Sequence, residues 1–75
     1  MFAIRLRKEW LERLRAEYPA GCRVELEEMD DAQAPPAGTQ GTVLWVDDIG
    51  TIQVKWDNGS GLGVVYGVDR CHKVE

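Results

Sequence analysis

The sequence predicts a mainly β fold, in which a small five-stranded barrel follows one N-terminal amphipathic α-helix. Two apolar runs, 42–46 and 52–56, are rich in the β-branched and aromatic residues that fit a pleated, half-buried sheet. A turn sequence that contains glycine follows each run, at 47–50 and at 58–59. Ahead of them, apolar residues recur every four positions over the first 18 residues, as on one face of a helix.

The helix is predicted over residues 4–18. Its apolar face combines residues four positions apart with one neighbour, namely Leu6, Trp10, Leu14, Tyr18 and Leu11. The other face carries the charged residues Lys8, Glu9, Glu12, Arg13 and Arg15. Pro19 and Gly21 end the helix, because the residue before a proline avoids the helical conformation. We expect the Trp10 face to cover one opening of the barrel.

The first strand is predicted over residues 22–28, where Val24 and Leu26 alternate with charged residues and point inward. A loop over residues 28–38 follows it, acidic at its start and stiffened by Pro35-Pro36. Its length is about 11 residues, and loops of that length in small domains are either functional or mobile.

Strands over residues 41–47 and 51–57 form the central hairpin. Ile52, Val54 and Trp56 alternate with polar residues, and this period of two puts the three side chains on the buried face.

The run Val43–Val46 in the first of these strands does not alternate. Either this strand is covered on both faces, or a bulge re-aims part of it. We therefore expect one of Leu44 and Trp45 to be exposed.

Two turns set the register of a three-strand antiparallel meander. Asp47–Gly50 suits a type I turn followed by Gly50 in the left-handed region, which glycine adopts without steric cost. Asn58-Gly59 suits a two-residue type I′ turn, in which both residues have positive φ. The meander then continues into a third strand over residues 60–66.

The chain closes with a tight turn at Gly67–Asp69 and a short strand over 71–74. A strand, a long loop, a three-strand meander, a short turn and a final strand follow one another in an SH3-like barrel. We therefore expect one domain over residues 1–75, with the helix at 4–18 and the SH3-like barrel at 22–75.

Composition and charge narrow the classes of function. The chain has 75 residues, of which 44% are hydrophobic, and a formal net charge of −4. It lacks both the run of about 18 apolar residues that spans a membrane and the apolar region of a secretory signal. We expect a cytoplasmic protein without membrane contact.

The charge is divided unevenly along the chain. Residues 1–23 carry six basic and three acidic residues, and residues 24–75 carry three basic and ten acidic ones. An acidic barrel repels phosphate, which counts against nucleic-acid binding by the barrel surface.

The residues predict no enzyme, no cofactor and no metal site. Cys71 and His72 are neighbours in a strand, so their side chains point to opposite faces and cannot form a thiol–imidazole pair. Cys22 and Cys71 lack the spacing of zinc ligands, and we expect both to be free thiols. The acidic runs lack the pattern of a calcium loop, and no helix follows the glycine-rich stretch 59–63 to receive a phosphate.

From Tyr18 to Lys73 the chain resembles a bacterial and phage domain-of-unknown-function family, number 4314 in that series. The matching stretches are YPAGCRVEL at 18–26, MDD at 29–31 followed by Pro-Pro-Ala-Gly, GTQGTVLWVDDIG at 38–50, VKWDNGSGL at 54–62 and GVD at 67–69. The resemblance implies a small protein that is frequent on mobile elements and has no assigned activity. Tyr66 stands where the family usually has proline, and Cys71 where it has a bulkier apolar residue. The central motif is also similar to SH3-like modules of larger proteins that bind other proteins.

These observations predict an interaction module whose partner is another protein. SH3-like barrels often bind peptides on aromatic residues between the long loop and the next hairpin loop. The candidate surface there consists of Met29, Asp30, Asp31, Trp45, Asp47, Asp48 and Tyr66. Trp45 is the expected anchor, and the alternative is that Trp45 only seats the N-terminal helix.

Two other functions stay open. The acidic groups would mimic nucleic acid and inhibit a DNA-binding enzyme if they formed one contiguous stripe. The helix would bind nucleic acid directly if its basic residues Arg5, Arg7, Lys8, Arg13 and Arg15 faced a phosphate backbone. The sequence does not predict the oligomeric state.

Overall fold

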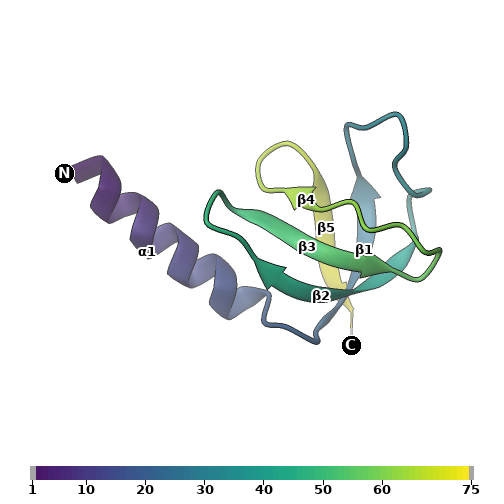
Figure 1. Ribbon diagram of the computed structural model, residues 1–75, viewed down its shortest axis with the longest axis horizontal. Coiled ribbons are helices and arrows are strands. Elements are labelled where there is room, and N and C mark those ends of the chain that lie inside the picture. The colour runs from purple at the N-terminus through teal and green to yellow at the C-terminus, as the bar shows by residue number, and fades with distance from the viewer. Residues whose placement is uncertain (1, 75) are drawn as a thin grey trace.

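The computed structural model describes residues 2–74, and it describes side chains from Arg7 to Val74. One helix precedes five strands, as Figure 1 shows. The elements are α1 (Phe2–Glu17), β1 (Arg23–Glu28), β2 (Gln40–Val46), β3 (Thr51–Trp56), β4 (Val64–Val65) and β5 (Arg70–Val74). The predicted helix and four of the five predicted strands agree with these bounds to within two residues.

The strands form one antiparallel sheet in the order β4-β3-β2-β1-β5. The mainly β prediction is confirmed, but the sheet does not close into a barrel. In the described residues β4 pairs only with β3 and β5 only with β1, and the two edge strands share no ladder.

The short β4 gives the reason why the barrel stays open. The predicted strand over 60–66 is wrong except at Val64–Val65. The Leu62 carbonyl accepts a hydrogen bond from the Trp56 indole Nε1 at 2.7 Å, which takes this segment out of the ladder. At Val65 the N–H donates to Asp69 Oδ2 and the carbonyl accepts from the N–H groups of Val68 and Asp69. The turn therefore uses the backbone groups that closure onto β5 would need.

The core lies on the inner face of the sheet. Ile52, Val54 and Trp56 are each 1% exposed, which confirms the period-two prediction. Gly41 pairs with Trp56, and a Cβ on Gly41 would lie 2.9 Å from the Trp56 ring. Only glycine lets the indole close over β2 at this point.

Both hairpin turns have the same design. Gly50 has φ 88° and donates to the Asp47 carbonyl at 3.1 Å, as predicted. Gly59 has φ 94° and donates to the Trp56 carbonyl at 2.9 Å. The type I′ prediction is wrong, because no non-glycine residue in the described range 2–74 has positive φ, Asn58 included. Asn58 Oδ1 instead accepts the Ser60 N–H at 3.0 Å, which fits a type I turn followed by glycine.

A bulge explains the run of β2 that does not alternate. The register between β2 and β3 shifts between Val43 and Trp45. The extra residue leaves both Leu44 (43% exposed) and Trp45 (56% exposed) outside the core, where only one of them was expected.

The helix contacts the sheet through its last two turns, and its N-terminal part extends away from the sheet in Figure 1. Leu11 and Leu14 are buried, and Trp10 and Tyr18 pack against the core. Trp10 lies against Gly50 and stacks edge to face on Tyr66, with ring centroids 5.6 Å apart. The Trp10 face thus covers one end of the sheet, and the predicted role of Leu6 lies outside the described side chains. No helix within residues 2–74 is long and apolar enough to cross a membrane.

Candidate functional site

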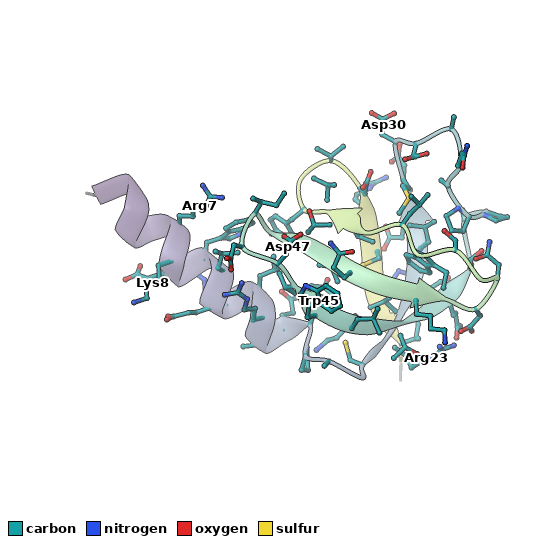
Figure 2. The ribbon with its side chains drawn as sticks, in the orientation of Figure 1. Arg7, Lys8, Arg23, Asp30, Trp45 and Asp47 are labelled. Carbon is teal, nitrogen blue, oxygen red and sulfur yellow. The ribbon has the colours of Figure 1, made fainter. Side chains whose placement is uncertain are left out.

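The seven candidate residues come from three parts of the fold. Met29, Asp30 and Asp31 lie in the loop after β1. Trp45, Asp47 and Asp48 lie at the end of β2 and in the next turn, and Tyr66 follows β4 directly. In Figure 2, Asp30 lies well apart from Trp45 and Asp47. The structure therefore separates the acidic loop from the Trp45 region, instead of joining them in one surface.

Trp45 lies on the outward face of the sheet. It pairs across the ladder with Gln53, and Gln53 Nε2 donates to Asp47 Oδ2 at 3.1 Å. More than half of the Trp45 side chain is in contact with solvent, and Leu44 beside it is also exposed. The alternative role predicted for Trp45 was contact with the N-terminal helix. Trp10 of the helix fills that role instead, because it packs against Gly50 and Tyr66.

Asp47 organises its turn. Its Oδ1 accepts the N–H groups of Thr51 at 2.9 Å and Ile49 at 3.2 Å. These bonds to the charged form, from Thr51 first and then from Gln53, hold the pKa of Asp47 below its usual range although desolvation opposes them. Both Asp47 oxygens are thus already occupied, Oδ1 by backbone N–H groups of Ile49 and Thr51 and Oδ2 by the Gln53 side chain of β3.

Asp48 ties the same turn to the helix. Arg15 donates through its terminal nitrogen to Asp48 Oδ1 at 2.8 Å and through Nε to the Val46 carbonyl at 3.1 Å. Arg7 adds a longer hydrogen bond of 3.3 Å to the Asp48 carbonyl. Two of the five basic residues proposed to contact nucleic acid are therefore engaged with the β2–β3 turn. The Arg5 side chain lies outside the described ones.

The loop after β1 is fastened to the turn before β5 by Asp69. Asp69 is the buried polar residue of the core region, 7% exposed. Its Oδ1 accepts the Asp30 N–H at 2.8 Å, and its Oδ2 accepts the Val65 N–H at 2.9 Å. Sequence reasoning treated Asp69 only as a turn residue. An aspartate at the end of a Gly-Val-Asp turn is a local signal that its side chain caps the turn. The sequence carries no such signal for the second partner, the Asp30 N–H, which lies 39 positions away.

Tyr66 borders two clefts. The larger, about 450 Å³, lies between the open edges of β4 and β5 and is lined in part by Tyr18, Tyr66, Val68 and Cys71. The smaller, about 210 Å³, is lined by Tyr66 and by the α1 residues Trp10, Arg13, Leu14 and Glu17. Burial, followed by the nearby Cys71, raises the pKa of Tyr18 to about 12, so its hydroxyl stays protonated at neutral pH. The sequence pattern placed Trp10 and Tyr18 on the apolar face of the helix, and it carried no sign that they also border clefts.

Several charged side chains lie in separate pairs on the surface. The ion pairs are Arg15–Asp48, Arg23–Asp57 and Arg70–Glu28, and His72 Nδ1 lies 2.7 Å from Glu27 Oε2. They lie on the helix, on the outer face of the sheet and along β5, so at these four places an acidic side chain lies next to an arginine or an imidazole.

The two cysteines are free thiols. Cys71 pairs with Leu26, four residues along β1 from Cys22. That offset corresponds to about 13 Å along a strand, beyond the roughly 7 Å Cα separation that a disulfide spans. Burial, then the nearby Cys22 and Glu27, raises the pKa of Cys71 to about 11. In the part of the chain that the structure describes, no group of three or more His, Cys, Asp or Glu side chains could hold a metal ion.

A protein-family model described as "Domain of unknown function (DUF4314)" matches residues 7–74. No curated protein and no solved structure matches the chain.

Proposed function

Because the chain belongs to the DUF4314 family of domains of unknown function, we propose its function from surface geometry: it is a protein-interaction module that binds its partner through Trp45. The observation that carries this proposal is the exposure of Trp45, which is 56% exposed on the outward face of β2 beside the bulge. The hydration of an exposed tryptophan side chain is unfavourable in free energy. Tryptophan is also among the residues that most often dominate the binding energy at protein interfaces.

Two features around Trp45 support the proposal. The β2 bulge puts Leu44 and Trp45 outside the core together, so they provide adjoining apolar area. Asp47 fixes the turn next to them and so makes the platform rigid before a partner arrives. Asp48, whose side chain is 97% exposed, supplies a negative charge in the same turn for steering a basic partner.

We also propose that the open sheet is an SH3-like fold. The neighbouring positions of the first and last strands support this, together with the β2–β3–β4 meander and the short turn that precedes β5. The Tyr66–Asp69 bridge is the place where a closed barrel would join its edge strands.

The two other functions have less support. A nucleic-acid mimic needs a row of unpaired carboxylates, whereas Glu27, Glu28, Asp48 and Asp57 each face a basic side chain. Direct nucleic-acid binding through the helix has fewer basic groups at its disposal, because Arg7 and Arg15 hold the β2–β3 turn.

The test compares affinity capture by the immobilised chain with capture by Trp45→Ala, from a lysate of the source organism with quantitative mass spectrometry. The matched control is Ile49→Ala, a side chain that is 70% exposed on the adjoining turn. We expect at least one protein to be retained by the unsubstituted chain and by Ile49→Ala and lost with Trp45→Ala. Equal capture by all three chains would remove Trp45 as the anchor.

A further inference from the structure

A second site, apart from Trp45, lies where the sheet fails to close. The cleft of about 450 Å³ between β4 and β5 is within the size range of sites that take a bulky side chain or small ligand. The core side chains Ile52 and Val64 line it from within, and Tyr18, Tyr66, Val68 and Cys71 border it. Tyr66 and Val68 are more than half exposed, so apolar surface continues from the cleft to the solvent.

The charged residues at the cleft are already satisfied inside the molecule. Arg70 pairs with Glu28 at 2.7 Å, and Glu27 Oε2 lies 2.7 Å from His72 Nδ1. Both oxygens of Asp69 accept backbone N–H groups. A charged ligand group would lose its hydration without finding a free partner here, so charge matching favours an uncharged occupant.

The backbone beside the cleft favours an extended occupant. One edge of β5 pairs with β1, and no described residue forms a backbone hydrogen bond with the other edge. An edge strand presents unpaired N–H and C=O groups on alternate residues, which another strand can pair with. The edge of β4 offers fewer free backbone groups, because the Val65 N–H and carbonyl already form hydrogen bonds within the turn.

The geometry points to a peptide-binding cleft that takes an extended, uncharged segment of a partner protein. The segment pairs with the free edge of β5 and places one bulky apolar side chain between Tyr18 and Tyr66. The Tyr18 hydroxyl, which borders the cleft, donates to a carbonyl of the bound segment.

The test titrates the isotope-labelled full chain with three blocked pentapeptides and follows backbone amides by NMR. The first probe is acetyl-Thr-Val-Phe-Val-Thr-amide; the second has serine in place of phenylalanine, and the third has glutamate in place of both valines. We expect the first probe to bind with a Kd on the order of 1 mM and to shift the amides of Val64, Tyr66 and Cys71. We expect the serine and glutamate probes to bind at least about tenfold more weakly, because one lacks the apolar side chain and the other carries charge.

Two substitutions at exposed residues provide the controls. Val68→Arg adds a charge at the rim and is expected to weaken the first probe about tenfold, whereas Ile49→Arg on the other turn leaves it unchanged. Trp45→Ala is also expected to leave binding unchanged, so the two proposed sites are tested independently. Slower hydrogen exchange of β5 amides in the bound state would support strand pairing, and unchanged exchange would overturn it. Equal binding of the phenylalanine and serine probes, shifts centred on Trp45, or no saturable shift would each overturn the proposal.

Discussion

Gly50 combines a left-handed backbone conformation with a packing contact to Trp10 of the helix. Its φ of 88° is in the left-handed region, and a Cβ at this position would overlap the Trp10 ring. Gly59 has φ 94° but nothing within 4 Å of an added Cβ, so it shows the same backbone strain without the contact.

Alanine substitutions at Gly59 and Gly50 separate the contribution of backbone strain from that of packing against Trp10. Gly59→Ala is expected to lower the free energy of unfolding by about 1–2 kcal/mol, the cost of a non-glycine residue in the left-handed region. Gly50→Ala should cost about 1–3 kcal/mol more, because Trp10 must also move. Urea unfolding measures both values. Equal losses would show that Trp10 does not rest on Gly50 in solution.

Tyr18 gives the stability a dependence on alkaline pH. Its pKa is raised from 10.0 to about 12, with burial as the first cause, so the folded state keeps a proton that the unfolded state loses. The contribution is complete below pH 10 and is lost as the pH rises to about 12. Tyr18→Phe removes this proton, so its free energy of unfolding should fall less steeply between pH 10 and 11.5 than that of the unsubstituted chain. Identical slopes would show that Tyr18 is not shielded by the fold.

The helix is fixed to the sheet by one arginine besides its apolar face. Arg15 bonds to the Val46 carbonyl and to Asp48 across the β2–β3 turn. Arg15→Ala should cost about 0.5–1.5 kcal/mol and speed hydrogen exchange in the last turns of α1. Arg13→Ala, on the same helix and without a described ion pair, should stay within about 0.5 kcal/mol. If the two variants exchange alike, the Arg15 contacts do not hold the helix.

Asp69 fixes the long loop after β1 to the turn before β5. Asp69→Ala leaves the Asp30 and Val65 N–H groups without their acceptor, which should cost about 1–3 kcal/mol. The direct measurement is hydrogen exchange at these two amides, which should accelerate together. Acceleration at Val65 alone would mean that the loop is not tied to the turn in solution.

The elements show what the sequence could predict and why. The period of two in β3 and the four-residue period in α1 arise from local geometry, so both were readable from the residues. The Asp47–Gly50 turn was also predictable, because its hydrogen bonds join residues within the turn.

Features that depend on distant contacts could not be predicted. The closure of a sheet depends on whether β4 reaches β5, and the Trp56 indole and Asp69 decide this through bonds that no spacing reveals. The Asn58-Gly59 dipeptide alone favours a type I′ turn. In the structure the Asn58 side chain accepts a hydrogen bond from the Ser60 N–H, and the turn is of type I.

The whole molecule has one buried tryptophan in its sheet, Trp56, and one exposed tryptophan, Trp45, which we propose to be the binding residue. Trp56 is 1% exposed and bonded to the Leu62 carbonyl, so Trp56→Ala should cost about 3–5 kcal/mol as a core deletion. Trp45→Ala removes a side chain that is mostly in solvent, so it should change stability by no more than about 0.5 kcal/mol. Chemical unfolding of both variants measures the difference. If Trp45→Ala unfolds the domain as Trp56→Ala does, Trp45 is a structural residue.

Site-specific photo-cross-linking at position 45 tests most directly whether the chain binds a partner there. A benzophenone amino acid in place of Trp45 keeps a large aromatic group on the outward face, and the same substitution at Ile49 provides an exposed control. We expect irradiation in cells to link position 45 to one other protein, with little or no product from position 49. A product from position 49 and none from position 45 would contradict the assignment of Trp45 as the partner-binding residue.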